Sequence, residues 1–207
     1  MRDISIDCEG LGRRFDAPVI AIGAVAFDRD TGKLGATFYQ EIDLNSSIRA
    51  GRVDGDTLAW WMTQGAKARN VFASDERKLS LATTLLNFTT FCRSVGAGVP
   101  RAWGNGATAD ITWIEYALAM GSVGLGAPWH FTNIRDMRTI IDAADLDLRD
   151  IPPVGTAHNA LDDAIFQANA ISAAWQRIRR AMGLLEMPQK GTKAAAAVQS
   201  QDEDDEL

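Results

Sequence analysis

The alternation of apolar and polar residues predicts three strands in the first 43 residues. Residues 3–7 (DISID) alternate between the two kinds of side chain, which is the period-two pattern of a strand. Residues 19–28 (VIAIGAVAFD) are almost entirely apolar, as in a strand that is covered on both faces. Turn residues at 30–33 (DTGK) precede a further strand at 34–43 (LGATFYQEID). We therefore expect a meander of three strands joined by short turns.

Helical spacing is more frequent in the rest of the chain. Asp56 or Thr57 is expected to cap a helix that includes residues 58–62. Apolar residues spaced by three or four predict a longer amphipathic helix over 77–95. A short strand at 101–103, helices at 111–120 and 134–144, and a long helix at 159–182 complete the pattern. This order of elements predicts an α/β fold in which helices flank a mixed sheet.

Length and composition restrict the class of protein. The chain has 207 residues, of which 46% are hydrophobic, which suits one well-packed domain and excludes a disordered chain. No apolar run approaches the roughly 18 residues of a membrane span. Residues 1–7 lack the apolar stretch of a signal peptide, so we expect a cytoplasmic protein. Two cysteines, Cys8 and Cys92, are too few for a disulfide framework and are expected to be free thiols.

The net charge of −6 comes mostly from the C-terminal end. Residues 202–206 (DEDDE) are all acidic, whereas residues 1–201 carry 22 acidic and 21 basic side chains. Beyond Pro188 the composition changes to polar and alanine-rich segments, which we interpret as largely disordered. We therefore expect one folded domain at 1–182, a linker at 183–201 and an acidic tail at 202–207.

Two carboxylates, Asp7 and Glu9, lie two residues apart at the first predicted strand. Residues two apart project from the same face of a strand, so both side chains are within reach of one metal ion, opposite Ile6 and Cys8. The alternative is a solvated acidic pair at the point where the strand leaves the sheet.

Asp110 and the segment 158–163 (HNALDD) are further candidates. Asp110 follows a glycine-rich turn at the expected start of a helix, where it is either a functional carboxylate or an N-cap. His158 stands where a Pro/Gly loop enters the last helix, and Asp163 lies one turn further on, facing the same way. The alternative for His158 is helix capping, with the acidic residues favouring the helix dipole. The other histidine, His130, lies between two aromatic residues and is expected to be packed.

The order of these motifs resembles the DEDDh family of 3′→5′ exonucleases. The shared elements are Asp-x-Glu on the first strand, an aspartate after a mid-chain strand and His-x-Ala-x-x-Asp on the last helix, over residues 1–182. Further segments are similar to the subgroup that contains the phage DexA-type exonuclease and a mycobacterial RNase T-like exoribonuclease: 6–12 (IDCEGLG), 22–25 (IGAV), 57–61 (TLAWW), 103–106 (WGNG) and 135–139 (RDMRT). Two residues depart from the subgroup's pattern, since Gly10 stands at a usual threonine and Ala109 at a usual aromatic residue. The first departure is expected to loosen contacts with the terminal nucleotide.

The resemblance implies an RNase H-like fold with a five-stranded mixed sheet and hydrolysis of phosphodiesters with two divalent ions, Mg²⁺ or alternatively Mn²⁺. Hard cations prefer carboxylate oxygens, and the implied ligands are Asp7, Glu9, Asp110 and Asp163. His158 is the implied general base, because imidazole, with a usual pKa of about 6.5, accepts a proton near neutral pH. One of Trp60 and Trp61 is expected in the core and the other against a nucleobase. The implied substrate contacts are Gly10, Leu11, Trp61, Asn105 and Arg138.

The sequence thus predicts a metal-dependent 3′→5′ exonuclease that releases nucleoside 5′-monophosphates from nucleic acid with a free 3′ end. One alternative is a catalytically silent RNase H-like module that binds nucleic acid or a replication protein. Another is a proofreading exonuclease tethered to a polymerase by the acidic tail. DNA and RNA both stay open as substrates, because the choice depends on contacts to the 2′-hydroxyl. We also expect no membrane partner, a replication or repair protein as partner of the tail, and a homodimer as a candidate assembly.

Overall fold

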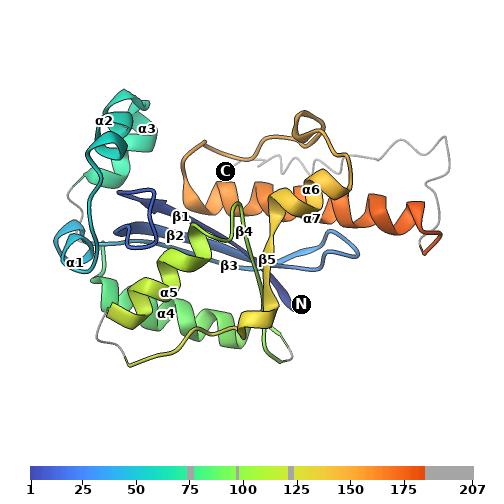
Figure 1. The fold of residues 1–207 in the computed structure, drawn as a ribbon, viewed down its shortest axis with the longest axis horizontal. Helices are drawn as coiled ribbons and strands as arrows, with labels where there is room; N and C mark the ends of the chain where they lie inside the picture. The colour runs from blue at the N-terminus through green and yellow to red at the C-terminus, as the bar shows by residue number, and fades with distance from the viewer. Residues whose placement is uncertain (74–76, 97, 121–123, 185–207) are drawn as a thin grey trace, which may run out of the picture.

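A five-stranded mixed sheet forms the centre of the molecule (Figure 1). The computed structural model describes residues 1–73, 77–96, 98–120 and 124–184. The strands are β1 (Asp3–Gly10), β2 (Val19–Phe27), β3 (Leu34–Glu41), β4 (Arg101–Gly104) and β5 (Ile134–Asp136), in the sheet order β3-β2-β1-β4-β5. The first three are antiparallel neighbours, whereas β4 and β5 run parallel to β1. The predicted meander, the α/β class and the five-stranded mixed sheet flanked by helices are confirmed.

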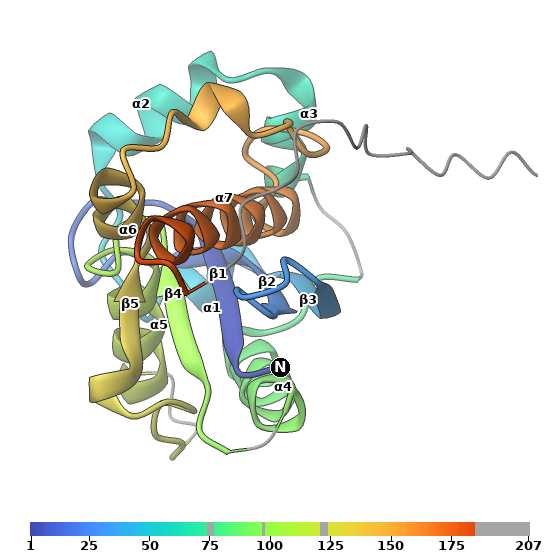
Figure 2. The same ribbon diagram turned by 90° about the vertical axis from the view of Figure 1, so that its right-hand side faces the viewer.

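The helices are α1 (Leu44–Ile48), α2 (Gly55–Thr63), α3 (Ala66–Arg69), α4 (Leu81–Ser94), α5 (Asp110–Met120), α6 (Met137–Ala143) and α7 (Ala160–Ala181). Three short 3₁₀ turns lie at Asn70–Phe72, Phe131–Asn133 and Leu148–Asp150. Helices α6 and α7 cover one face of the sheet, and α4 and α5 cover the other (Figures 1 and 2). Helices α2 and α3 lie beyond the end of the sheet at which β1 finishes (Figure 1).

Several predicted boundaries are wrong. The first strand continues to Gly10 rather than ending at residue 7, and the third ends at Glu41 rather than at residue 43. Residues 134–136 are a strand rather than the first turn of a helix, because Ile134 pairs with Ala102 of β4 and this pairing overrides the local preference. Helix α2 is capped by Asp54, whose carboxylate accepts the Thr57 N–H, and not by Asp56 or Thr57. Helix α4 begins at residue 81, after its Ser80 cap, and not at residue 77.

The two faces of β1 contribute to different environments. Ile4, Ile6 and Cys8 belong to the core between the sheet and helices α4 and α5. Ser5 and Asp7 face the other way, and both are bonded to the side chain of Gln167 on α7. The predicted alternation along this strand is therefore confirmed, and it directs the acidic side chains toward α7.

Helix α7 approaches the sheet closely at one glycine. Gly23 of β2, which pairs with Asp7 of β1, is in contact with the backbone of Ala160, and a Cβ at this position would overlap the Ala160 carbonyl group. The next two turns of the helix present Ala164 and Ala168, both fully buried, to the same sheet. Small residues on both surfaces thus bring the start of α7 next to the end of β1.

The remaining expectations concern the ends and the cysteines. Helix α7 ends at Ala181, and the predicted linker (183–201) and acidic tail (202–207) lie, from residue 185 on, outside the described residues. Cys8 and Cys92 are free thiols, as predicted, and both are buried. Among the described helices, none has the length and apolar character of a membrane span.

We predict that Gly23→Ala lowers the free energy of unfolding by about 3 kcal/mol or more, because backbone atoms of α7 must move away from the new methyl group. Urea denaturation measures this loss. The control is Gly55→Ala, since no atom lies within 4 Å of a Cβ at this helical position, and it should leave stability unchanged or slightly raised. Equal stability of the two variants would contradict a close helix–sheet contact at Gly23.

Candidate active site

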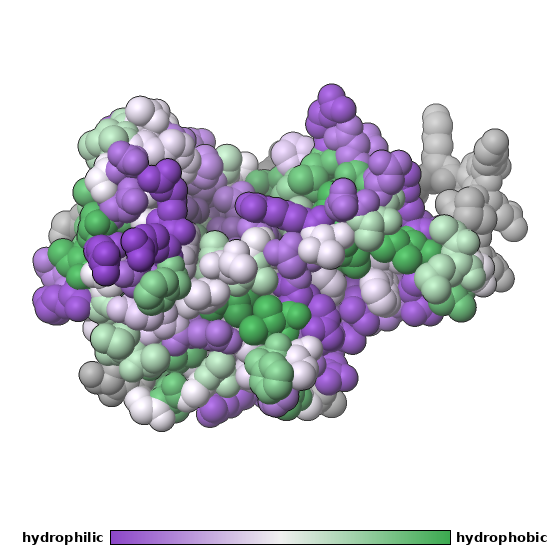
Figure 3. Space-filling view, in the orientation of Figure 1, coloured by the Kyte–Doolittle hydropathy of each residue, from purple (hydrophilic) through white to green (hydrophobic). Residues whose placement is uncertain are grey.

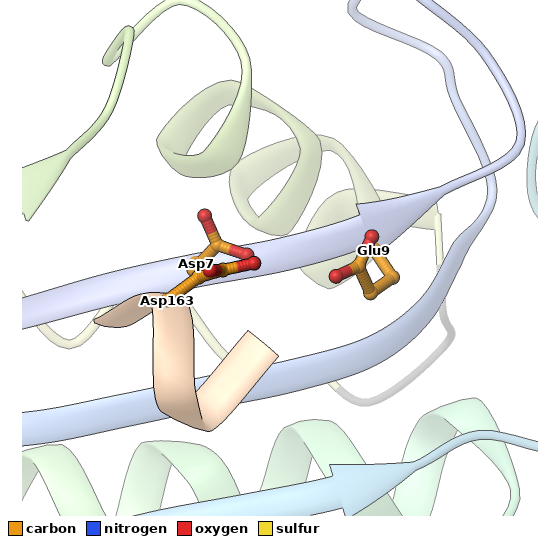
Figure 4. A group of neighbouring side chains, drawn as sticks. All are labelled: Asp7, Glu9 and Asp163. Carbon is orange, nitrogen blue, oxygen red and sulfur yellow. The ribbon is translucent and has the colours of Figure 1, made fainter. Parts of the chain in front are cut away.

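Three carboxylates converge where β1 ends and α7 begins (Figure 4). Asp7 and Glu9 project from β1, and Asp163 comes from the first turn of α7. Each contributes an oxygen, and these oxygens lie within 4.8 Å of one another. The predicted cluster of Asp7, Glu9 and Asp163 is therefore present, although the two elements are about 150 residues apart in sequence.

Gln167, which sequence reasoning missed, orients Asp7. Its Nε2 donates to Asp7 Oδ1 at 2.6 Å, and its Oε1 accepts from the Ser5 hydroxyl at 3.4 Å. The side chain is 2% exposed, so this amide is a buried polar group with partners on both sides. The signal that could have found it is its position one helical turn after Asp163, on the same face of the helix.

Asp110 lies beside this cluster rather than in it. Its two oxygens accept the backbone N–H groups of Cys8 and Asn105, each at 3.1 Å. These bonds tie the start of α5 to β1 and to the end of β4, so the carboxylate fixes the local chain and does not cap its own helix. Each carboxylate oxygen has a second lone pair, so the predicted role of Asp110 as a ligand stays a prediction.

The loop before α7 holds His158 in a strained conformation. His158 has φ +63°, in the left-handed region that residues other than glycine adopt only in a few per cent of cases, histidine, asparagine and aspartate more often than most. Its N–H donates to Asp163 Oδ2 at 2.9 Å, while Asp162 accepts the Thr156 N–H at 2.8 Å. Asn159 is the N-cap of α7. The alternative in which His158 caps the helix is therefore wrong, and Asp162 stabilises the loop.

The ring of His158 lies against tryptophan. It makes an edge contact with Trp60, with ring centroids 5.1 Å apart and planes at 86°. The other histidine, His130, is exposed, and its Nδ1 lies 2.7 Å from the Thr132 hydroxyl. The expectation that His130 is packed is thus wrong, because the 3₁₀ turn after it places the ring at the surface.

Burial raises the pKa of every carboxyl group in the centre, and repulsion by neighbouring carboxylates of the centre adds to this at Asp7 and Glu9. Desolvation, with the charges of Asp110, Glu9 and Asp163, raises the pKa of Asp7 well above its usual range. Burial, then the charges of Asp163 and Asp110, raise the pKa of Glu9 to about 8. Burial raises the pKa of Asp110 to about 7 and also raises that of Asp163. The fold therefore concentrates negative charge that a cation would stabilise.

The donor set fits a divalent metal ion. Carboxylate oxygens are the ligands that Mg²⁺ and Mn²⁺ prefer. None of the ion pairs among the described residues neutralises Asp7, Glu9 or Asp163. The buried thiol of Cys8 points into the core on the other face of the strand. The chemistry and the charge of the centre thus match hard cations.

Three clefts meet at Glu9. The central one, of about 340 Å³, contains the acidic cluster together with Asn105, His158 and Gln167. A polar cleft of about 560 Å³ lies on one side and is lined by side chains that include Tyr39, Glu41, Lys67, Asn70, Thr156 and Asn159. A third, more apolar one of about 400 Å³ is lined by Trp60, Trp61 and Trp113. Figure 3 shows that this face of the molecule is hollowed between the α2–α3 part and the α6–α7 part.

The predicted substrate contacts fall into two groups. Leu11 and Trp61 are 3% and 1% exposed and pack in one core cluster, and Trp61 also lines the apolar pocket, so substrate contact by these two residues stays a prediction. Trp61 also donates its indole N–H to the Gly10 carbonyl at 3.0 Å. Trp60, at 43% exposed, is the tryptophan of the pair that is open to a ligand.

Arg138 is exposed and Asn105 is half-buried, whereas Gly10 is buried. Gly10 lines the apolar pocket and Asn105 lines the central cleft. Asn105 Oδ1 accepts from Arg138 Nε at 3.1 Å, which holds the exposed guanidinium near the central cleft. Substrate contact by these three residues stays a prediction.

The fold and this acidic centre define a class, the nucleases with an RNase H-like sheet. The sequence profile of the Rv2179c-like 3′-5′ exoribonuclease domain matches residues 2–175, and the chain belongs to this family. The protein is therefore a 3′→5′ exonuclease, and the family resemblance predicted from the motifs is confirmed. The finer assignment to the DexA-type subgroup stays a prediction. No curated protein sequence matches the chain significantly.

Solved structures agree on the fold. Pop2p of S. pombe in its Mg²⁺- and Mn²⁺-bound form is 14% identical, with a TM-score of 0.53 over 88% of this chain and 84% of that one. A full-length 3′-exonuclease is 13% identical, with a TM-score of 0.52 over 84% and 82%. A 3′-exonuclease described in 3′-end specific recognition of a histone mRNA stem-loop is 12% identical, with the same TM-score and coverage. At these identities the likeness establishes the fold alone.

We predict that Glu9→Gln makes the metal-free protein more stable at pH 8 by about 1–3 kcal/mol. Because folding raises the pKa of Glu9 from 4.5 to about 8, the folded protein holds a proton that the unfolded chain has released, so wild-type stability falls as pH rises through this range. Glutamine has no such proton, and the variant should lose less stability between pH 5.5 and pH 8. Urea denaturation in EDTA at both pH values measures the difference.

The control for this experiment is Asp142→Asn, which removes the same charge from an exposed position of α6 and should leave stability nearly unchanged. Mg²⁺ should raise the melting temperature of the wild type more than that of Glu9→Gln. A Glu9→Gln protein that is no more stable than the wild type in EDTA at pH 8 would show that repulsion in the centre is weak.

Proposed function

We propose that this protein is a metal-dependent exonuclease that removes nucleoside 5′-monophosphates from the 3′ end of RNA. The observation that carries the proposal is the convergence of three carboxylates within 4.8 Å, beside a histidine held in a strained loop. Strained residues that the surrounding structure holds in place are common at functional sites. A silent binding module would need neither the concentrated charge nor this strain.

Asp7, Glu9 and Asp163 would hold the metal, with Asp110 as the further ligand that a second ion needs. Two divalent ions, when bound, would neutralise charge on the phosphodiester and on its attacking and leaving oxygens. The chain's own contribution is the position of the carboxylates. Gln167 fixes Asp7, and the His158 N–H fixes Asp163. Both bonds orient the ligands before substrate binds.

His158 is proposed as the general base. The ring of His158 lines the central cleft that contains the acidic cluster, and it makes an edge contact with the ring of Trp60. A neutral imidazole nitrogen would take the proton of the attacking water. The aromatic contact and the fixed backbone restrict the ring, which lowers the entropic cost of placing it next to the water.

RNA is the proposed polymer because the family to which the chain belongs is described as an exoribonuclease family. The polar cleft beside Glu9 offers side-chain acceptors and donors, among them Asn70 and Asn159, that suit a ribose hydroxyl. The test is digestion of matched RNA and DNA oligomers with a 5′ label, single-stranded and duplex, with Mg²⁺, with Mn²⁺ and in EDTA. Faster shortening of RNA from its 3′ end is expected, with no reaction in EDTA.

Other outcomes of this assay decide against parts of the proposal. Full activity in EDTA would exclude the metal mechanism. Cleavage of a circular RNA would exclude an exonuclease, and preference for DNA would exclude RNA as the main substrate.

We predict that His158→Asn lowers the turnover of an RNA oligomer by roughly 10²–10⁴-fold, as expected for loss of a general base. Asparagine tolerates the left-handed conformation at this position better than alanine does, so its melting temperature should stay near that of the wild type. His158→Ala should lose the same activity and, in addition, about 1 kcal/mol of stability.

Metal binding separates catalysis from site assembly in these variants. Mg²⁺ should still raise the melting temperature of His158→Asn, because the proposed ligands are untouched. A His158→Asn enzyme with near-normal turnover would remove His158 from the chemistry.

A further inference from the structure

Three tryptophans line the apolar pocket beside Glu9. Trp60 and Trp61 come from α2, whereas Trp113 comes from α5 on the other side of the β1 end. Glu9 lines both this pocket and the central cleft, so the pocket opens directly beside the proposed reaction centre. Its volume of about 400 Å³ is within the range of small-molecule sites and suits one nucleobase.

Trp113 occupies space that only glycine leaves free. A Cβ at Gly10 would lie 2.8 Å from Cζ3 of the Trp113 ring and 3.2 Å from Cε3. Real Cβ atoms do not approach a ring this closely, so any other residue at position 10 would displace the indole. Gly10 and Trp113 therefore form a matched pair, in which the missing side chain of the first makes room for the second.

The indole N–H of Trp113, unlike those of the buried Trp61, Trp103 and Trp129, donates no hydrogen bond to a described residue. This N–H is buried and has no hydrogen-bond partner among the described residues. The other tryptophans with a recorded partner donate to the Gly10 carbonyl (Trp61), Asp3 (Trp103), Glu115 (Trp129) and Asp30 (Trp175). An unsatisfied buried N–H costs about 1–3 kcal/mol. A large aromatic residue that weakens the fold in this way needs a reason beyond stability.

We propose that Trp113 forms the wall that contacts the base of the 3′-terminal nucleotide, and that Gly10 is required to admit it. The inference rests on the proposed exonuclease function. The backbone N–H of Trp113 donates to the Ala109 carbonyl at 2.8 Å, which holds Trp113 at the start of α5, beside Gly10 at the end of β1. The contact is with the face of the base, so it does not select one base over another.

The first experiment compares Trp113→Leu with the wild type on short RNA oligomers that carry either a normal or an abasic 3′-terminal nucleotide. Loss of a base–indole contact should raise KM for the normal oligomer by roughly 5- to 100-fold, with a smaller change in kcat. The abasic oligomer already lacks the contact, so the variant and the wild type should turn it over alike. Trp113→Phe, which keeps an aromatic ring, should fall between the two.

The matched control is Trp175→Leu, at the far end of α7, where the ring packs under Arg29 at 3.8 Å and is remote from the pocket. It should leave both KM values unchanged. Melting temperatures of all variants identify any that fail to fold. If Trp113→Leu raises KM equally for the normal and the terminally abasic oligomer, Trp113 does not contact the terminal base. The same holds if the difference between variant and wild type disappears for an oligomer whose penultimate nucleotide is abasic instead.

The second experiment is a double-mutant cycle between positions 10 and 113. Gly10→Thr alone should raise KM for the normal oligomer at least as much as Trp113→Leu, because it displaces the indole. The double variant Gly10→Thr/Trp113→Leu should be no worse than Trp113→Leu alone, since the smaller side chain leaves room for threonine. Additive losses would overturn the matched pair. A wild type that hydrolyses none of these oligomers would instead refute the proposed function, so the two failures are distinct.

Discussion

Helix α7 contacts the sheet backbone to backbone at Gly23, where β2 has no side chain to hold the helix away. This contact sets the height of the first turns of α7 above β1, because Gly23 pairs with Asp7 across the two strands. Asp163 and Gln167 then follow at helical spacing, one against the acidic cluster and the other against Asp7 itself. The geometry of the centre is thus a consequence of hydrophobic packing of small residues along one helix–sheet interface.

The same packing holds like charges together against their repulsion. Raised pKa values at Asp7, Glu9, Asp110 and Asp163 show that the folded chain destabilises the charged carboxylates. The donors around them compensate in part, since Gln167 and three backbone N–H groups bond to these oxygens. The remaining negative charge attracts a cation. A cation that binds to such an anionic centre only in the folded protein would raise the free energy of unfolding.

The surroundings of Glu9 differ in chemistry from one side to the other. Tryptophan lines the pocket toward α2 and α5, whereas amide, hydroxyl and ammonium groups line the cleft toward α3 and β3. A nucleotide has the same division, with an apolar base face and a polar sugar and phosphate. The strained His158 lies between the two sides, in contact with Trp60. This division suits the proposed binding of a terminal nucleotide beside the acidic centre.

Local sequence was sufficient for several features. Period-two alternation fixed which residues of β1 face the core, and with it the common direction of Asp7 and Glu9, because neighbours in a strand point to opposite faces. The family motifs marked Asp163 as a candidate metal ligand and His158 as a candidate general base. The Pro/Gly loop predicted that His158 lies just before a helix. The nearly all-apolar segment at 19–28 predicted a strand covered on both faces, and the structure confirms it as a fully buried strand over Val19–Phe27.

Tertiary structure decided the rest, because long-range contacts select among local alternatives. Ile134–Asp136 is a strand only through its pairing with β4, and Trp61 rather than Trp60 is buried because its indole meets the Gly10 carbonyl across the chain. The Asp110 carboxylate links the start of α5 to β1 and to the end of β4, because it accepts the N–H groups of Cys8 and Asn105. Its position in the sequence was also compatible with an N-cap. The order of residues shows neither the bond of Gln167 to Asp7 nor the match of Gly10 with Trp113. Each depends on which side chains the packed sheet and helices bring within a few ångströms of one another.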